Sequence, residues 1–371
     1  MTATLRLVLD QLVDPTEPDL GQATRELARA LTATAPAGCD VEGLVSAAPD
    51  ARAAAGRAAP DLAEVTALGL RRRELAAAWQ MGVTAGAAGG MIHSPSLLAP
   101  LVRHDRIHDH DQTVVTVWDL RAWESPDELG RTAAMWQRAM LKRAARFADA
   151  IVVPTHATAR ALAERAALGD RIRVIPGAAP QGFRVPSDDV GRRRDLRLPD
   201  GYVLIAAARP ADLVDAFRAV AQTRADTPVV VLDIAAGEEP AVMAAATSAG
   251  LPEHAVHVRG FVDQHDRGAV LGAALVVLAP DTRTSFPWRV LEAMAVGVPI
   301  VAVSSPVHDE IVVDGGVLAD AADPGALGDA LATALGSTAA VERLAVLAAD
   351  RGRAFTWLGA AERVWQLHAD L

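Results

Sequence analysis

The sequence predicts an α/β protein with two domains, each built on a parallel β-sheet covered by helices. Short apolar runs alternate with helix-like segments along the whole chain, which is the pattern of repeated βαβ units. The chain has 371 residues, more than one hydrophobic core usually holds. The alternation stops over residues 177–201, which are rich in proline, glycine, aspartate and arginine, and then resumes. We expect this stretch to be an irregular linker.

The predicted strands divide evenly between the two halves. In the first half they lie at residues 5–9, 41–45, 91–93, 113–118, 151–153 and 172–175, with the clearest helices at 131–147 and 157–167. In the second half they lie at 202–206, 229–232, 255–258, 275–278, 300–303 and 316–318, with helices at 211–222 and 287–296. We therefore expect an N-terminal domain over residues 1–183 and a C-terminal domain over 184–354.

Composition excludes several classes of function. Asp and Glu total 46 against 36 Lys and Arg, so the net charge of −10 argues against nucleic acid as a partner. The single cysteine, Cys39, excludes an internal disulfide framework and a cysteine-based zinc site. No long uninterrupted apolar run occurs, which predicts a cytoplasmic protein. Lys142 is the only lysine, so any phosphate-binding cation in the second half must be an arginine.

The most informative stretch is TSFPWRVLEAMAVGVPIVAV, residues 284–303. Pro287 is placed to open a helix and Gly297 to end it before the next strand. The start of this helix would lie beside the carboxyl end of a strand, where free N–H groups favour a diphosphate. Within the helix, Glu292 is surrounded by apolar residues and needs a partner to offset desolvation. Ligand hydroxyls are one candidate; a solvent-facing turn or an intrahelical pair with Arg289 are the alternatives.

The stretch VLEAMAVGVPIVA resembles the donor-site motif of the family 4 retaining glycosyltransferases, which usually reads EGFGLPVLEAMACGVPVVA. The resemblance implies a GT-B architecture, with two Rossmann-like domains facing across a cleft and a C-terminal helix, residues 355–371, that packs back on the N-terminal domain. It also implies that Glu292 holds the ribose hydroxyls of a nucleotide and that Phe286 is the motif phenylalanine.

The motif also departs from the family pattern. Thr284 stands where the first glutamate is usual, and Ser285 and Pro287 replace the two glycines. Thr284 and Ser285 keep hydroxyl groups that can hydrogen-bond a sugar. We expect both to contact the donor.

The resemblance further implies a set of residues that bind the diphosphate and the base. Arg209 best matches the family arginine, while the accompanying lysine is absent. Arg283 or Arg289 could compensate, because arginine binds phosphate through two parallel hydrogen bonds; solvated surface charges are the alternative. Gly260, in VHVRGFVDQHD, begins a loop expected near the nucleotide base.

Two first-half residues are candidates for the acceptor side and for catalysis. In TVVTVWDLRAWESPDEL, Asp119 matches a family aspartate, while Trp118 stands where histidine is usual. Asp119 either orients the acceptor or caps a turn. In IHSPSLLAP, His93 follows a strand on the side where ligands collect; a structural histidine is the alternative. We predict no metal site, since the histidines and aspartates of RHDRIHDHDQ also fit a polar loop.

Two hypotheses on function follow. The first is a retaining, metal-independent glycosyltransferase that moves a sugar from a nucleoside-diphosphate sugar, its substrate, to an acceptor hydroxyl, with no cofactor. The family suggests a glycan or lipid-linked acceptor in cell-envelope or polysaccharide synthesis, and a location in the cytoplasm with the inner membrane face as an alternative. The second is an inactive GT-B scaffold that binds carbohydrate or a partner transferase, motivated by the losses in the donor motif.

Overall fold

The computed structural model describes residues 3–87, 89–207, 210–224, 227–323 and 325–371. The chain folds into two compact units. Unit 1 consists of Met1–Gly177, Thr284–Phe286 and Thr356–Leu371, and unit 2 of Ala178–Arg283 and Pro287–Phe355. The first division falls at residue 177, a little before the boundary expected from the sequence. The three-residue segment Thr284–Phe286, part of the candidate motif, thus belongs to unit 1.

Unit 1 contains a parallel sheet that, within the described residues, has seven strands in the order β3-β2-β1-β4-β5-β6-β7. The strands are β1 (Ala3–Val8), β2 (Cys39–Val45), β3 (Glu64–Ala67), β4 (Met91–Ser94), β5 (Gln112–Thr116), β6 (Ala150–Val153) and β7 (Ile172–Val174). The helices are α1 (Asp10–Val13), α2 (Pro18–Ala33), α3 (Ala51–Ala58), α4 (Arg72–Met81), α5 (Arg121–Glu124), α6 (Pro126–Leu129), α7 (Arg131–Phe147), α8 (His156–Ala163) and α17 (Trp357–Asp370), with one 3-10 turn at Gly169–Arg171.

Unit 2 repeats this topology with a six-stranded parallel sheet over the residues described, in the order β10-β9-β8-β11-β12-β13. Its strands are β8 (Tyr202–Ile205), β9 (Val229–Val231), β10 (Val256–Val258), β11 (Ala274–Ala279), β12 (Ile300–Val303) and β13 (Val317–Ala319). Its helices are α9 (Asp189–Asp195), α10 (Pro210–Arg224), α11 (Glu239–Ser248), α12 (Gln264–Ala273), α13 (Trp288–Val296), α14 (Pro306–Ile311), α15 (Ala326–Ala334) and α16 (Thr338–Gly352), with one 3-10 turn at Glu253–Ala255.

Both sheets reverse their strand order at one point, between β1 and β4 in unit 1 and between β8 and β11 in unit 2. In doubly wound sheets, ligands bind beyond the carboxyl ends of the strands at such a switch point. The loops after β1, β4, β5, β8 and β11 are therefore the places to look for a site. The loops after β5 and β11 include Asp119 and the motif segment, and His93 lies within β4, one residue before its end.

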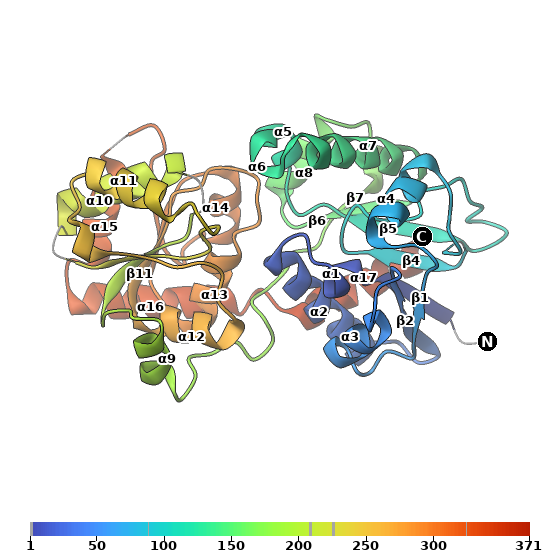
Figure 1. Ribbon diagram of the computed structural model, residues 1–371, viewed down its shortest axis with the longest axis horizontal. Helices are drawn as coiled ribbons and strands as arrows, with labels where there is room; N and C mark the ends of the chain where they lie inside the picture. Colours follow the sequence, from blue (N-terminus) through green and yellow to red (C-terminus); the bar gives the residue numbers. More distant parts are fainter. Residues whose placement is uncertain (1–2, 88, 208–209, 225–226, 324) are drawn as a thin grey trace. The chain divides into compact units, whose positions relative to one another are not determined.

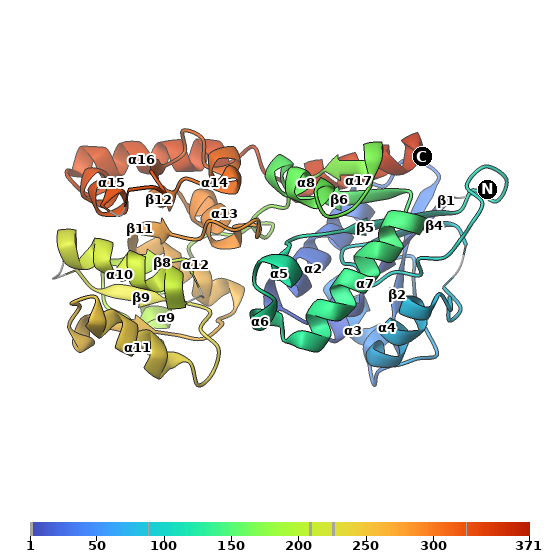
Figure 2. The ribbon, with the colours of Figure 1, turned by 90° about the horizontal axis from the view of Figure 1, so that it is seen from above.

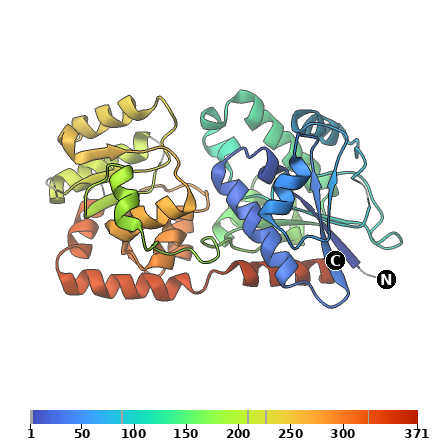
Figure 3. The same cartoon turned by 60° about the horizontal axis from the view of Figure 1, so that its bottom comes forward.

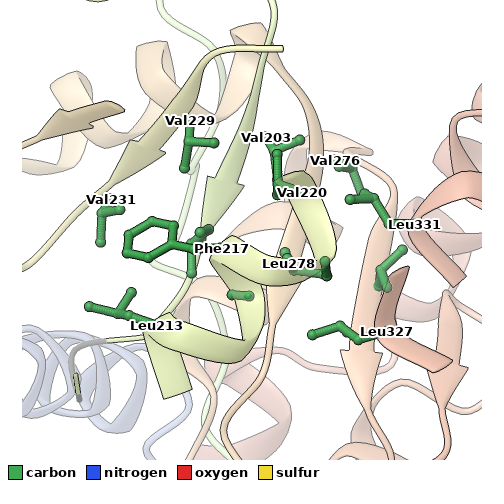
Figure 4. Close-up of a cluster of buried hydrophobic side chains, with 14 of the residues drawn as sticks. Val203, Leu213, Phe217, Val220, Val229, Val231, Val276, Leu278, Leu327 and Leu331 are labelled. Carbon is green, nitrogen blue, oxygen red and sulfur yellow. The ribbon is translucent and has the colours of Figure 1, made fainter. Parts of the chain in front are cut away.

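Central strands such as β6, β8 and β9 form because they are apolar on both faces, as buried parallel strands must be. In unit 2, α10, α11 and α15 lie on one face of the sheet and α9, α12, α13 and α16 on the other (Figure 1). Figure 4 shows Leu213, Phe217 and Val220 of α10 facing Val203 and Val229 of the strands. All five side chains are fully buried. This packing holds the sheet rigid beneath the loops at its carboxyl edge.

The terminal helix α17 belongs to unit 1 and runs alongside α2 (Figure 3). Thr356 caps it by accepting a hydrogen bond from the Gly359 N–H at 3.1 Å. Trp365 is buried and its indole N–H donates to the Leu31 carbonyl at 3.1 Å. On the same sheet, α4 and α7 pack side by side (Figure 2).

Three elements differ from the sequence-based expectation. Strand β3 was not predicted, because its residues are exposed or only half-buried at the sheet edge and carry no continuous apolar run. The expected linker at residues 177–201 contains α9, in which Arg192 pairs with Asp188 at 2.9 Å and Arg193 pairs with Asp189. Charged i,i+4 pairs support a short helix without an apolar stripe. Helix α13 begins at Trp288, with Pro287 as its N-cap.

Among the described residues, no single helix is long and apolar enough to cross a membrane. One bent pair of segments, Ala326–Ala334 and Thr338–Asp370, passes that test together by length and composition.

Candidate functional site

The motif of unit 2 forms the loop, helix and strand that its residues predict. Helix α13 follows the carboxyl end of β11, and the Pro287 carbonyl accepts from the N–H groups of Val290 and Leu291 at 3.0 and 3.2 Å. Gly297 ends the helix in the left-handed conformation, at φ 69°, which favours glycine. The first turn of α13 thus lies at the edge of the sheet where ligands collect.

The Glu292 carboxylate is buried in an ion-pair network. Arg267 of α12 donates from Nε to both carboxylate oxygens at 3.1 and 3.2 Å and from Nη2 to Oε1 at 2.9 Å. Arg289 donates from Nη1 to Oε2 at 3.1 Å, so the intrahelical pair considered from the sequence is present. The side chains of Arg267 and Glu292 are only 2% and 3% exposed. The partners that offset the desolvation of Glu292 are therefore two arginines of unit 2.

Sequence reasoning missed Arg267. The signal was available, because an arginine within RGAVLGAALVVL faces the same desolvation cost as Glu292 and needs an anionic partner. Its guanidinium also lies 5.1 Å from the ring centroid of Phe261, which is 46% exposed. Gly260 precedes this ring after β10, with the Ile234 carbonyl oxygen 3.4 Å from where a Cβ would stand. The predicted role of Gly260 near a base remains a prediction.

The candidate diphosphate-binding arginines are all engaged with carboxylates, except one that lies outside the described residues. Arg289 donates from Nε to Asp233 at 2.7 Å, besides its bond to Glu292. Arg283 donates to Asp281 from Nη2 at 2.7 Å and from Nε at 2.9 Å. Arg209 lies outside the described residues. Phosphate binding by Arg283 or Arg289 would require each guanidinium to share its donors with these carboxylates.

The segment Thr284–Phe286 is held by other residues of unit 1. The Thr284 hydroxyl donates to the Glu124 carboxylate, with both oxygens 3.0 Å from Oγ1. The Thr284 carbonyl accepts from the Thr158 hydroxyl at 3.2 Å. Phe286 is buried, and its ring centroid lies 5.7 Å from that of Trp118. The Ser285 hydroxyl oxygen is buried and has no hydrogen-bond partner among the described residues.

Trp118, which stands at the family histidine position, is a packing residue in unit 1. Its indole N–H donates to the Pro95 carbonyl at 2.9 Å, and the side chain is buried. Its ring also lies 6.4 Å from that of Trp357 at the start of α17. The three rings of Trp118, Phe286 and Trp357 thus join the loop after β5, the motif segment and the terminal helix. We call them the aromatic cluster.

Asp119 lies at the edge of a cavity of about 930 Å³ in unit 1. Its carboxylate accepts from the Arg121 backbone N–H at 2.9 Å, a turn contact, and from Arg121 Nη2 at 3.0 Å. Arg121 also pairs with Glu17. Burial lowers the pKa of Arg121, but Asp119 and Glu17 outweigh it and hold that pKa above its ordinary value. Burial raises the pKa of Glu17, with Arg121 opposing.

The walls of this cavity combine aromatic and charged groups. They include Trp118 and Trp136 together with Asp119, Arg121 and Glu17. Aromatic residues beside fixed carboxylate and guanidinium groups suit a polyhydroxylated ring, which presents apolar C–H faces and hydrogen-bonding edges. The cavity lies at the carboxyl ends of β1, β4 and β5, which is the expected side for a ligand.

His93 lies in the core of unit 1 with no exposed surface. Its Nδ1 is 3.3 Å from Nε2 of His368 on α17, and Nδ1 of His368 is 2.9 Å from the Gln112 side-chain oxygen. That oxygen only accepts, so His368 donates through Nδ1, and with both rings neutral His93 donates through its own Nδ1 to Nε2 of His368. Burial holds the pKa of His93 well below its usual value, with His368 adding to the effect. Contact of His93 with an acceptor would require this buried ring to become exposed, so its catalytic role remains a prediction.

We expect this buried pair to make unit 1 sensitive to acid. Burial lowers the pKa of His368 to about 4. The contribution of the neutral His368 ring to the free energy of unfolding is therefore complete above about pH 6.5 and is lost as pH falls towards 4. His368→Gln should reduce the acid-induced loss between pH 6.5 and 4.5 by about 2 kcal/mol. Urea unfolding at a series of pH values measures it, and superimposable wild-type and variant profiles would contradict it.

A second buried group opposes this trend in the same unit. Burial raises the pKa of Asp10 to about 6, although Arg72 acts against it, so the contribution of Asp10 is lost as pH rises through 6. Asp10→Asn, which removes this opposing term, should therefore steepen the acid sensitivity and serves as the control.

In the described part of the chain, no group of three or more His, Cys, Asp or Glu side chains is arranged to hold a metal ion. His104, one of the histidines of the polar loop, instead hydrogen-bonds Asp149 at 2.7 Å through Nε2.

Comparison with known proteins shows which protein family and which known folds this chain resembles. Residues 206–337 match the family described as "Glycosyl transferases group 1". The fold matches GT-B structures over nearly the whole chain. Sucrose-phosphate synthase from Thermosynechococcus elongatus has a TM-score of 0.70 at 19% identity, covering 99% of this chain and 98% of that one. Anabaena Alr3699/HepE in complex with UDP and glucose has a TM-score of 0.71 at 18% identity, with full coverage of both chains. The predicted GT-B fold is confirmed.

Sequence relatives are also glycosyltransferases by name. A D-inositol 3-phosphate glycosyltransferase from Nocardioides sp. is 32% identical over 209 residues, 50% of this chain and 46% of that protein. A phosphatidyl-myo-inositol mannosyltransferase from Mycobacterium leprae is 31% identical over 159 residues, 42% of this chain and 41% of that protein. The matched regions span less than half the length of these two relatives.

Proposed function

We propose that the protein is a glycosyltransferase that moves a sugar from a nucleoside-diphosphate sugar to an acceptor hydroxyl with retention of configuration. The observation that carries the proposal is the group 1 domain at residues 206–337, on a doubly wound sheet with the motif helix α13 at its carboxyl edge. HepE, of the same fold, was solved in complex with UDP and glucose. The motif, residues 284–303, would bind the donor, and the cavity of unit 1 would bind the acceptor.

The chemistry needs no group beyond those of the chain and the substrates. The first turn of α13 presents free N–H groups to the departing diphosphate, and arginines nearby stabilise the charge that develops there. The leaving phosphate would accept the acceptor's proton on the same face of the sugar, so neither an enzyme nucleophile nor a metal is required. Glu292 would act by holding Arg267 and Arg289 in place, because its oxygens already accept four hydrogen bonds.

Two relatives are named for acceptors that carry phosphorylated inositol. We extend the proposal to a glycan or lipid-linked acceptor in cell-envelope or polysaccharide synthesis, with the protein in the cytoplasm or at the inner face of the membrane.

The second candidate is an inactive GT-B scaffold that binds carbohydrate or a partner transferase. The observation that favours it is the occupied state of the motif groups, since Glu292 is paired with two arginines and Thr284 with Glu124. Turnover separates the candidates: release of nucleoside diphosphate from a nucleotide sugar by purified protein would reject the scaffold.

Thermal-shift screening against UDP, GDP, TDP and their common sugar conjugates tests the proposal. A ligand of the native state raises apparent stability by about 2.7 kcal/mol at one hundred times its Kd. We expect one nucleotide to stabilise the protein, with inorganic phosphate at the same concentration as the control. The shift should shrink in Arg289→Gln, which removes a candidate phosphate contact. No shift with any nucleotide at millimolar concentration would contradict a donor site.

A further inference from the structure

A carboxylate from elsewhere in unit 1 lies at the motif position that lacks one. Glu124 is the last residue of α5, 160 residues before Thr284 in sequence. Both its oxygens are 3.0 Å from Thr284 Oγ1, and Oε2 is 3.3 Å from the Thr284 backbone N. The contact therefore places a negative charge directly beside the first residue of the motif.

This carboxylate keeps unused capacity for hydrogen bonds. An ionised carboxylate offers about four lone-pair sites, while Thr284 has only two donors, its O–H and its N–H. Glu124 is half-buried, and within the described residues it forms no ion pair. In the part of the chain that the structure describes, no arginine pairs with this carboxylate, in contrast to those of Glu292 and Asp119.

A second polar side chain, that of Ser285, follows Thr284 in the sequence. The Ser285 hydroxyl oxygen is buried without a hydrogen bond among the residues described, and a buried polar atom in that condition costs free energy. A carboxylate that contacts Thr284 and a hydroxyl on the next residue are both groups that bind sugar hydroxyls, because the carboxylate accepts protons strongly and the serine can accept or donate.

We propose that Glu124 binds a hydroxyl of the donor's sugar beside Thr284 and supplies the charged acceptor that Thr284 itself lacks. The inference rests on the proposed function, because it assumes that the motif segment contacts a nucleotide sugar. Glu124 is thereby a residue that determines sugar affinity. Binding of the nucleoside diphosphate itself does not involve Glu124.

The test compares binding of UDP with UDP-glucose, and of GDP with GDP-mannose, by isothermal titration of the full-length protein. Glu124→Gln keeps the shape of the side chain and a hydrogen bond to Thr284 but removes the charge. We expect it to raise the ratio of nucleotide-sugar Kd to nucleotide Kd by tenfold or more. Thr284→Val, which keeps the carboxylate but removes the hydroxyl that it contacts, should raise that ratio less than Glu124→Gln does. Glu164→Gln, at a side chain 79% exposed, is the surface control.

Each outcome decides something different. An unchanged ratio in Glu124→Gln, with nucleotide binding intact, overturns the role of Glu124 and leaves the proposed function standing. Equal losses in Glu124→Gln and Thr284→Val overturn it too, because Glu124 would then act only by holding the segment. Absence of binding of all four ligands by the wild-type protein removes the donor site itself, and this inference with it.

Discussion

Replacing Glu292 with alanine should lower the free energy of unfolding of unit 2 by about 3–5 kcal/mol. The change leaves Arg267, 2% exposed, without the carboxylate that accepts three of its hydrogen bonds. An unpaired buried charge costs far more than the net stabilisation of the intact pair. Denaturant unfolding of the purified variant measures the loss.

Two further variants make this result interpretable. Asp350 and Arg353 form an exposed ion pair with the same spacing of three residues as Arg289 and Glu292. Asp350→Ala removes one partner of this exposed pair and should change the free energy of unfolding by no more than about 0.5 kcal/mol. Arg267→Leu combined with Glu292→Leu removes both charges and should recover much of the loss. A Glu292→Ala variant no less stable than Asp350→Ala would show that the buried pairing does not hold α12 and α13 together.

Trp118→Ala should lower the stability of unit 1 by about 3–5 kcal/mol. The substitution empties the centre of the aromatic cluster and removes ring contacts with Phe286 and Trp357, together with the hydrogen bond to Pro95. Thermal and denaturant unfolding measure it.

The matched control for this prediction is a partly exposed apolar residue. Leu358→Ala, at a side chain 42% exposed in α17, should cost far less. Trp118→Phe should fall between the two, because it keeps a ring but loses the donor to Pro95. A Trp118→Ala loss below about 1 kcal/mol would mean that the neighbouring rings close the space that the indole leaves.

Sequence patterns predicted the elements whose residues are apolar throughout. The strands β6, β8 and β9 are fully buried runs of this kind, and Gly297 marks the end of α13 where the glycine predicts it. Sequence patterns did not predict the elements that form through tertiary packing or through charged pairs. The edge strand β3 has little buried surface, and α9 is held by charged pairs that resemble a polar linker in sequence.

Only the part of the candidate site formed by residues close together in the sequence could be predicted. The motif identified Glu292 and its neighbour Arg289, which are close in sequence. The pairings of Glu292 with Arg267 and of Thr284 with Glu124 join residues 25 and 160 positions apart, and only the folded chain brings them together. His93 illustrates the converse: its place after a strand suggested a ligand, but α17 brings His368 over it.

The two units contain different natural chromophores. Of the seven tryptophans, only Trp288 lies in unit 2, whereas the other six, including Trp118, Trp357 and Trp365, lie in unit 1. The single tyrosine, Tyr202, is fully buried in unit 2, where its hydroxyl donates to the Val270 carbonyl at 2.5 Å. Tryptophan emission therefore reports mainly on unit 1. Without any label, an unfolding experiment followed by fluorescence can show whether a ligand protects unit 1.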